Sequence, residues 1–391
     1  MFPATLLLIG VGSLGTVLLE LLARQAWPGR IVAASRNAAR GEARCNLARL
    51  GALAQGGAGG AGGAGGAGGA PRIEFEPLDL DDRDATAELV DRLEPNLILS
   101  TASRLTWWLP GLLPAPQATR LARAGFGPWL PLHLSLSMKL MAAVREAGYA
   151  GHTLTAPFPD VVNAVLAKRD LAPTCGIGNV AEVVPKVQAH AALRLGVDSR
   201  EVRVTLVAHH ALQPAVFGER AERPPYFLSI EHQGRDVTAQ VDGDALLFAP
   251  YPLPPGPAIH FLTAASAIPL MRALCREGET RLHAPAPGGL PGGYPVLADR
   301  SGVRPAPIPG LGLEEAVEIN ERSHRYDGIE GIETDGTVVF REESAAVLGE
   351  ELGYDCRRLS PSETEARAEE LLARLGEYAR RHGASIEREN G

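Results

Sequence analysis

Cysteine is scarce in this chain of 391 residues, which contains only four. Cys45, Cys175, Cys275 and Cys356 are scattered, with neither the paired spacing of a metal site nor the density of a disulfide scaffold. No set of Cys, His and Asp residues has the spacing of metal ligands, so metal-dependent chemistry is disfavoured. The cysteine pattern fits a reducing compartment, and we expect a cytoplasmic protein.

Long apolar runs and an excess of positive charge are also missing. The run Leu6 to Ile9 is too short for a signal peptide, and no other run approaches the roughly 20 apolar residues of a membrane span. The formal net charge is -8 and the pI is about 5.8, which disfavours nucleic acid and anionic membranes as partners. A local basic pocket outweighs net charge, so the expected partner is a small-molecule substrate.

Strand and helix patterns alternate in the first part of the chain, which predicts a parallel sheet with right-handed crossovers. The expected strands are 5–10, 30–34, 73–77, 96–103 and 152–157, and the expected helices are 13–24, 81–93 and 134–147. Residues 51–70 read GALAQGGAGGAGGAGGAGGA, an Ala/Gly repeat with nothing to bury. We interpret this repeat as a flexible surface insertion, because the sheet pattern continues on both sides.

A change of pattern near residue 155 predicts three parts of the chain. Residues 1–155 form the expected dinucleotide-binding domain, and the length of the chain allows a second domain after it. Within this first part, the Pro-, Gly- and Trp-rich stretch 104–134 is expected to be an irregular loop over the sheet. Residues 156–359 mix helices with antiparallel-looking strands and predict a catalytic α+β domain, and residues 360–391 predict a C-terminal amphipathic helix.

A glycine motif follows the first expected strand and opens the first expected helix. It comprises Gly10, Val11, Gly12, Ser13, Leu14 and Gly15. In this context the first glycine permits a tight turn, the second lets the backbone approach a pyrophosphate, and the third packs helix against strand. The predicted fold class is therefore α/β, with an N-terminal Rossmann doubly wound parallel sheet and a C-terminal mixed α+β domain.

The ends of two later strands bear on which dinucleotide is bound. Where a carboxylate normally binds the ribose hydroxyls of NAD, the sequence has Ser35 and Arg36, with Arg40 one helical turn further. A hydroxyl and a guanidinium accept a 2′-phosphate that a carboxylate would repel. NADP is therefore favoured over NAD. Binding of NAD is the alternative, because a solvated arginine beside an NAD ribose is common. Thr101 and Ala102, after the fourth strand, are further candidates for cofactor binding.

Two adjacent histidines end the strand pattern EVRVTLVAHHAL. Strand alternation puts His210 on the more apolar face and His209 on the other, so the two are not expected to ligate one metal ion. A histidine at a strand end facing a cleft is a natural proton donor and acceptor near neutral pH. We favour His210 over His209 as the acid/base; the alternative is a core histidine bonded to the backbone.

Four segments occur in a particular order within residues 4–325. They read RNAARGEARCNLARL, LTAPFPDVVNAVL, GIGNVAEVVPKVQAHAALRLGV and GGYPVLADRSGVRPAPIPGLGLEEAVEINERS. This order resembles that of the lactate and malate dehydrogenases, and the chain is identified as a remote member of that family. The resemblance implies hydride transfer between a nicotinamide cofactor and a carbonyl or hydroxyl substrate. It also implies a homodimer or homotetramer.

The resemblance implies a set of site residues when it is carried over position by position. Pro157 matches the proline of the family's Asn-Pro pair, whereas Ala156 stands at the Asn position. Glu182 falls at the Asp that orients the catalytic His, and Lys186 at the Arg that binds the substrate carboxylate. Being four residues apart, they would share a helix face, and a surface Glu/Lys pair is the alternative. The candidates for a second substrate arginine are Arg104, Arg120 and Arg123.

These observations predict an NAD(P)-dependent oxidoreductase whose substrate carries an anionic group. His210 would donate the proton, Glu182 would orient the His210 ring, and Lys186 would bind the anionic group of the substrate. Residues 76–103 also resemble a segment of saccharopine and opine dehydrogenases, which implies an imine reductase acting on an amino acid plus a keto acid. A third hypothesis is an NADP-binding regulator without turnover.

Overall fold

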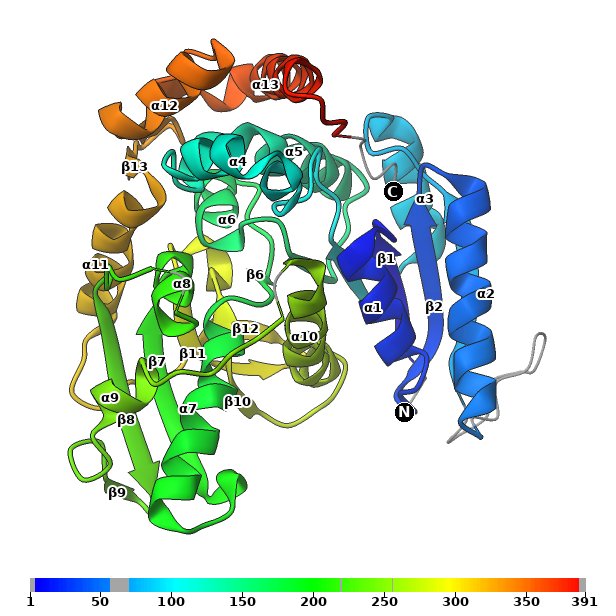
Figure 1. Cartoon of the computed structure of the whole chain (residues 1–391). Helices are drawn as coiled ribbons and strands as arrows, with labels where there is room; N and C mark the ends of the chain where they lie inside the picture. Colours follow the sequence, from blue (N-terminus) through cyan, green and yellow to red (C-terminus); the bar gives the residue numbers. More distant parts are fainter. Residues whose placement is uncertain (1–3, 57–69, 219, 255, 387–391) are drawn as a thin grey trace.

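The computed structural model describes residues 4–56, 70–218, 220–254 and 256–386 (Figure 1). The expected Gly/Ala insertion at 51–70 lies largely outside this range. Its first four residues, 51–54, end helix α2 (Ala38–Ala54), so these four are helical where an insertion loop was expected.

A six-stranded parallel sheet forms the N-terminal half of the protein. Its order is β3-β2-β1-β4-β5-β6, which is the doubly wound order that the sequence predicted. The strands are β1 (Ala4–Ile9), β2 (Pro28–Ser35), β3 (Arg72–Pro77), β4 (Leu97–Ser100), β5 (His152–Thr155) and β6 (Cys175–Gly176). The strand β6 extends the sheet past the expected domain boundary at residue 155. This strand was not predicted from the sequence, because a strand of two residues is too short to show a pattern.

Helices cover both faces of the parallel sheet, and alternate residues of β1 face opposite layers. Leu6 and Leu8 lie in the cluster with α1 (Ser13–Leu22) and α2, whereas Leu7 and Ile9 lie with α3 (Arg83–Leu93) and α5 (Leu130–Glu146). The strand residues Leu6 to Ile9 are almost completely buried, as expected of a strand covered on both faces.

The stretch 104–134, expected as an irregular loop, contains ordered helices. The 3-10 helix η1 (Leu109–Leu112) precedes α4 (Ala115–Ala122), and η2 (Gly127–Trp129) leads into α5. Prolines at the first turns of these elements occupy positions where no intrahelical N–H bond is lost, so they start helices here. The prediction of a loop was wrong because proline was taken only as a breaker.

The second half is built on an antiparallel sheet of order β10-β11-β7-β8-β9, with β12 paired to β11. Its strands are β7 (Val202–Ala208), β8 (Tyr226–His232), β9 (Arg235–Asp236), β10 (Thr280–Pro285), β11 (Gly293–Asp299) and β12 (Gly302–Pro305). Helix α7 (Val180–Leu195) packs on β7, and α10 (His260–Leu274) packs on both α1 and α7. Short helices α8 (Gln213–Val216) and α9 (Gly243–Leu247) border this sheet.

One helical stretch reaches the length and hydropathy of a membrane span, contrary to the expectation. Gly256–Leu274 has a mean hydropathy of 1.2, and 39% of its apolar window is buried inside the protein. Because its buried residues, among them Ala264, Ala267 and Leu270, pack in the same cluster as α1, this stretch is weak evidence for a span.

The C-terminal segment folds back onto the helices of the parallel sheet (Figure 1). Helix α11 (Leu313–Ser323) leads to a small antiparallel sheet of β13 (Ile329–Ile332), β14 (Val338–Phe340) and β15 (Arg358–Leu359). Helices α12 (Glu342–Leu352) and α13 (Thr364–Arg381) then pack over α4 and α5. The predicted amphipathic C-terminal helix is thus present, with buried Leu371 and Leu375 in one core with α5.

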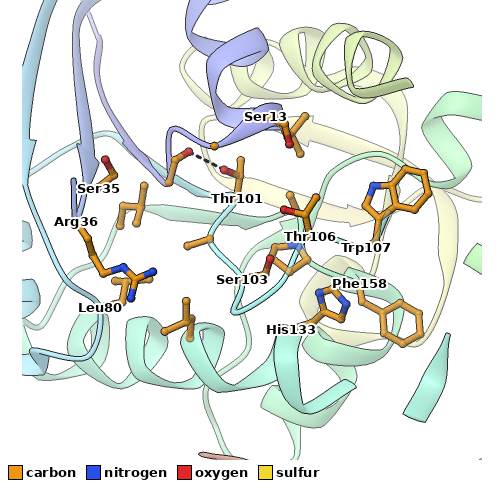
Figure 2. Close-up of a pocket in the computed structure, with 18 of the residues that line it drawn as sticks. Ser13, Ser35, Arg36, Leu80, Thr101, Ser103, Thr106, Trp107, His133 and Phe158 are labelled. Carbon is orange, nitrogen blue, oxygen red and sulfur yellow. Dashed lines mark hydrogen bonds between the residues drawn. The ribbon is translucent and has the colours of Figure 1, made fainter. Parts of the chain in front are cut away.

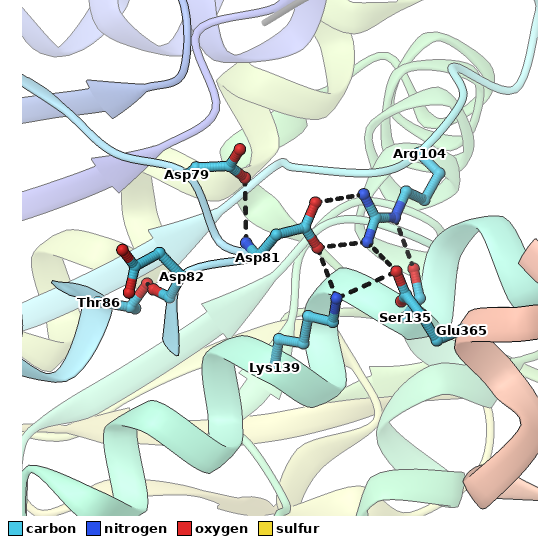
Figure 3. A network of polar contacts seen from close by, with 8 residues as sticks. All are labelled: Asp79, Asp81, Asp82, Thr86, Arg104, Ser135, Lys139 and Glu365. Atoms are coloured by element: carbon cyan, nitrogen blue, oxygen red, sulfur yellow. Dashed lines mark hydrogen bonds and ion pairs between the residues drawn. The ribbon is translucent and has the colours of Figure 1, made fainter. Parts of the chain in front are cut away.

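An ion-pair network joins this C-terminal helix to the parallel sheet (Figure 3). The Arg104 guanidinium, only 8% exposed, pairs with Asp81 from the β3–α3 connection and with Glu365 on α13. Lys139 on α5 reaches the same two carboxylates, with Nζ 2.5 Å from Asp81 and 3.0 Å from Glu365. The network fixes four segments that are far apart in the sequence.

Candidate functional site

The glycine motif forms the tight strand-to-helix turn that its sequence predicts. Gly10 follows β1 with φ of 89°, and Gly12 is the N-cap of α1. A Cβ atom on Gly15 would lie 1.8 Å from the carbonyl oxygen of Gly10, so only glycine fits. Thr101 donates its hydroxyl hydrogen to the Gly10 carbonyl at 2.7 Å and holds the turn against the end of β4 (Figure 2). The N-terminus of α1 therefore opens onto a cleft, as anion binding requires.

A continuous cleft runs from this turn across the carboxyl ends of the strands. Ser35 and Arg36 lie at one end, and Trp107, His133 and Phe158 at the other (Figure 2). The lining includes the predicted residues Gly10, Gly12, Ser13, Leu14, Ser35, Arg36, Thr101 and Ala102. Of the other predicted cofactor residues, Val11 and Gly15 are buried in the turn, and Arg40 lies on α2 outside the lining. The residues present fit a dinucleotide laid along the cleft.

A deeper cavity of about 410 Å³ continues the cleft toward the antiparallel sheet. Eight residues line both spaces: Leu14, Thr106, Trp107, Phe126, His133, Ala156, Phe158 and His260. The indole N–H of Trp107 donates to Nε2 of His260 at 3.1 Å, which links the loop after β4 to the start of α10. His210 lies on the wall of the deeper cavity.

His210 pairs with a carboxylate that the sequence did not indicate. Its Nδ1 lies 2.9 Å from Oδ2 of Asp327, which follows α11 in a 3-10 turn. Burial opposes protonation of His210, but the negative charges of Asp327 and Asp160 outweigh it and raise the pKa of His210. Burial likewise opposes ionisation of Asp327, yet the attraction of His210 holds the pKa of Asp327 below its usual value. The pair favours an imidazolium whose Nε2 is available to a ligand.

His209 occupies a different environment, with a side chain that is 0% exposed and outside the cavity lining. Its Nδ1 accepts a hydrogen bond from the backbone N–H of Ala211 at 3.2 Å, which places the proton of the neutral ring on Nε2. Burial and the neighbouring His324 push the pKa of His209 well below its usual value. The geometry therefore favours His210 over His209 as the acid/base, and His209 acts as a neutral cap of the turn after β7.

A second buried carboxylate fixes the backbone at His210. Asp160, in the first turn of α6 (Pro159–Ala167), accepts from the backbone N–H of His210 and from Nδ2 of Asn179 at 3.0 Å. Burial raises the pKa of Asp160 to about 6, against the opposing effect of Asn179 and His210. Asp160 thus positions His210 through its main chain, while Asp327 holds the ring.

The structure places neither Glu182 nor Lys186 where the resemblance implied. Glu182 lines the cavity, and its carboxylate accepts hydrogen bonds from the side chain of Gln213 and from the backbone N–H of Asn179. Within the described structure, no hydrogen bond joins Glu182 to His210. Lys186 points away from the cavity, where Nζ donates to the carbonyls of Val216 at 2.6 Å and Leu247 at 2.8 Å. The two residues do share a helix, as expected. Asp327 replaces Glu182 as the partner of His210, and Lys186 ties α7 to α8 and α9.

The expected second arginine also lies elsewhere. Arg104 belongs to the ion-pair network of Figure 3, and Arg120 pairs with Glu351 at 2.8 Å. Arg123 is the exposed C-cap residue that follows α4, outside the lining. Instead, Arg220 lines the cavity, with Nη1 donating to the Tyr326 carbonyl at 3.1 Å beside Asp327. No sequence signal marked Arg220, because it lies in an irregular stretch after α8.

Known proteins resemble this chain in their fold and not in their sequence. No family model matches the sequence, and no curated protein matches it. Among solved structures, a lactate dehydrogenase from a Medee basin deep-sea metagenome superposes with a TM-score of 0.55 at 12% identity, over 83% of this chain and 97% of that one. A Cryptosporidium parvum malate dehydrogenase gives 0.56 at 12% identity, over 83% and 96% of the two chains.

A lactate dehydrogenase from Eimeria maxima, solved with NADH and oxamate, gives 0.55 at 11% identity over 83% and 92% of the two chains. This chain has the fold of the lactate and malate dehydrogenases. At these identities the likeness concerns the fold alone. Residues 76–103 form the β3–α3–β4 unit common to such sheets, so they do not distinguish a saccharopine-type relative.

The described part of the chain contains no group of three or more His, Cys, Asp or Glu side chains placed to hold a metal ion. His209 and His210 both turn Nδ1 toward Oδ2 of Asp327, at 3.5 and 2.9 Å. Arg220 also lies close enough to His210 and Asp327 to act on the charge of both.

Proposed function

We propose that this protein is an NAD(P)-dependent oxidoreductase that interconverts a carbonyl and a hydroxyl group on a substrate with an anionic group. The observation that carries the proposal is the placement of His210, paired with Asp327 at 2.9 Å, on a cavity continuous with the glycine turn at α1. A proton donor beside a dinucleotide cleft is the arrangement that carbonyl reduction requires.

Three residues of the cavity, His210, Asp327 and Arg220, have a defined part in the proposed reaction. A reduced nicotinamide, when bound, supplies the hydride that the carbonyl carbon accepts. His210, as imidazolium, donates a proton from Nε2 to the carbonyl oxygen, and it takes the proton back in the oxidation direction. Asp327 is a positioning residue that holds the ring by Nδ1 and stabilises the protonated form. Arg220 offers the guanidinium for the anionic group of the substrate.

The reaction is tested by His210→Asn, which keeps a polar side chain but cannot transfer the proton. Turnover of reduced cofactor with carbonyl substrates should be lost, while cofactor affinity by fluorescence titration should stay within a few-fold. The control is His190→Asn, on α7 against Tyr251 and outside the cavity lining. Unchanged turnover in His210→Asn would refute the assignment. Binding of reduced cofactor without consumption, across a panel of carbonyl compounds, would instead favour the regulator hypothesis.

The preferred cofactor is proposed to be NADP. Ser35 and Arg36 line the end of the cleft where the adenosine ribose binds in this fold, and the exposed Arg36 guanidinium can donate hydrogen bonds to a 2′-phosphate. Asp79 lines the same end and is the feature that would favour NAD, although Oδ1 of its carboxylate already accepts from the backbone N–H of Asp81 at 3.0 Å.

A titration with NADPH and NADH, followed by Arg36→Ala, tests this preference. NADPH should bind at least tenfold tighter than NADH, and the difference should collapse in the variant because the charged hydrogen bonds are lost. Arg44→Ala, on α2 and outside the lining, is the matched control. Equal affinity for the two cofactors would show that Arg36 is a solvated side chain. No binding of either would overturn the dinucleotide assignment itself.

A further inference from the structure

The cavity beside His210 is large and mostly apolar. Its volume of about 410 Å³ falls in the range of roughly 300–1,000 Å³ typical of pockets for sizeable organic ligands. Beyond the residues shared with the cofactor cleft, the large apolar side chains of the walls are Leu105, Pro110, Leu121, Trp129, Leu132 and Phe217, and the polar ones include Asn179, Gln213 and Thr263. The apolar side chains come from the loop after β4, from η1, α4, η2 and α5, and from the turn after α8.

The positive charge in this cavity is limited to one permanent cation. Among the described residues that line it, Arg220 alone carries a guanidinium or ammonium group. The carboxylates are Asp327, held by His210, and Glu182, whose pKa is raised by burial. A dicarboxylate would therefore find no second lysine or arginine among the described lining residues, and its second anion would share the cavity with the carboxyl groups of Asp327 and Glu182, at a large desolvation cost.

We propose, resting on the function proposed above, that the substrate is a monocarboxylic 2-oxo acid with a bulky aromatic or branched aliphatic side chain, or the matching 2-hydroxy acid. Its carboxylate pairs with Arg220, its carbonyl oxygen meets Nε2 of His210, and its apolar side chain fills the pocket under α4. In the reduction, the C–H bond forms with a hydride from the reduced nicotinamide, and the oxygen takes the proton of His210. The products are the 2-hydroxy acid and the oxidised cofactor.

The same geometry disfavours two other substrate classes. A three-carbon 2-oxo acid would leave the apolar walls around Leu121 and Trp129 in contact with water, so it gains little binding energy there. An imine formed from an amino acid and a keto acid carries two carboxylates, for which Arg220 offers one partner. The inference thus separates the proposed substrate from those of the opine-type alternative.

The first test measures kcat/KM for a series of 2-oxo acids with the preferred reduced cofactor. The series is pyruvate, 2-oxobutyrate, oxaloacetate, 4-methyl-2-oxopentanoate and phenylpyruvate. The two bulky monocarboxylates should exceed pyruvate and oxaloacetate by at least tenfold. Calorimetry of phenylpyruvate binding to the protein with oxidised cofactor gives a readout that does not need turnover.

Two pairs of variants locate the effect. Ala122→Trp fills the pocket from α4 and should lower kcat/KM for phenylpyruvate at least tenfold relative to pyruvate, whereas Thr119→Trp, exposed on the same helix outside the lining, should not. Arg220→Ala should weaken phenylpyruvate binding at least tenfold. Its control Arg223→Ala removes an exposed arginine that pairs with Asp244 outside the cavity.

The outcomes separate this inference from the proposed function. Turnover that is best with pyruvate or oxaloacetate overturns the inference and leaves the oxidoreductase proposal standing. Absence of turnover with every 2-oxo acid, while cofactor binds, overturns the proposed function. In that case phenylpyruvate binding that depends on Arg220 still supports the ligand class, and absence of binding overturns it.

Discussion

His210 and Asp327 are 117 residues apart in the sequence, and their side chains meet with Nδ1 2.9 Å from Oδ2. The contact joins the end of β7 to the turn after α11, and thus closes the antiparallel half of the protein around the cavity. Asp160 adds a third segment by accepting from the His210 backbone. The orientation of one imidazole therefore depends on three stretches of chain that share no local motif.

Replacing Asp327 by Asn should move the pH profile of carbonyl reduction to lower pH. The negative charge of Asp327 helps to raise the pKa of His210, and the proton-donating form of His210 exists only below that pKa. In the wild type, kcat should fall as pH rises through the raised pKa; in Asp327→Asn the fall should begin at lower pH. We expect kcat at neutral pH to drop by about a hundredfold.

The measurement is kcat against pH from 5 to 9 with saturating cofactor. Asp355→Asn, at an exposed carboxylate near β15, is the control and should leave the profile unchanged. A variant with lower kcat but an unshifted profile would mean that Asp327 supports the fold without controlling the protonation of His210.

Replacing Lys186 by Met distinguishes a structural lysine from a substrate anchor. The substitution leaves the carbonyls of Val216 and Leu247 without their donor, so the free energy of unfolding should fall by roughly 2 kcal/mol. The KM for an anionic substrate should not change, because Nζ does not reach the cavity lining. A KM raised tenfold with intact stability would restore the anchor role.

Lys186 also predicts a pH dependence of stability. Burial lowers the pKa of Lys186 from 10.5 to about 8, so between these values the unfolded chain binds more protons than the folded one. The contribution of this residue to stability therefore rises with pH from about 8 to 10.5. Urea unfolding across this range should show the rise in the wild type and a flatter dependence in Lys186→Met.

Substituting Gly15 by Ala should remove cofactor binding and destabilise the protein. The added Cβ would lie 1.8 Å from the Gly10 carbonyl, and the clash can be relieved only by opening the turn that faces the cleft. We expect a loss of at least a few kcal/mol in stability and no detectable dinucleotide binding. Gly376→Ala is the control, because no atom lies within 4 Å of its added Cβ on α13, and it should stabilise by about 0.5–1 kcal/mol. If Gly15→Ala still bound the cofactor tightly, the cofactor would not depend on the turn between Gly10 and Gly15.

The parts of the structure that could be predicted are those with local signals. Alternating strands and helices gave the parallel sheet, and the spacing from Gly10 to Gly15 gave the cofactor turn, because both depend on residues close in sequence. The pattern EVRVTLVAHHAL also led to His210. The strand itself ends at Ala208, however, so both histidines lie in the turn after it, and it is His209, not His210, whose side chain is completely buried.

The parts that could not be predicted depend on contacts between distant segments. Asp327 and Arg220 have no motif, and only the folded arrangement brings them to His210. The structure places Lys186 off the cavity, because matching its position to a family motif does not say which way a helix residue points. Helix α4 was missed because prolines at Pro114 and Pro116 start the helix where they were taken to break it.

Replacing Asp81 by Asn should weaken the attachment of the C-terminal helix in a pH-dependent manner (Figure 3). Arg104 and Lys139 lower the pKa of Asp81 from 3.8 to about 2, so its contribution to stability is complete above pH 3.8 and is lost as pH falls toward 2. Because the Asp81 side chain is 36% exposed, solvent screening limits the contribution of its ion pairs to the free energy of unfolding to about 1 kcal/mol. Urea unfolding of the wild type and Asp81→Asn should therefore differ at pH 7, and the difference should shrink as pH falls from 3.8 toward 2. The control Asp355→Asn removes an exposed carboxylate outside the network and should show no such convergence. A difference that stayed constant with pH would mean that the loss comes from geometry around Arg104, not from the charge of Asp81.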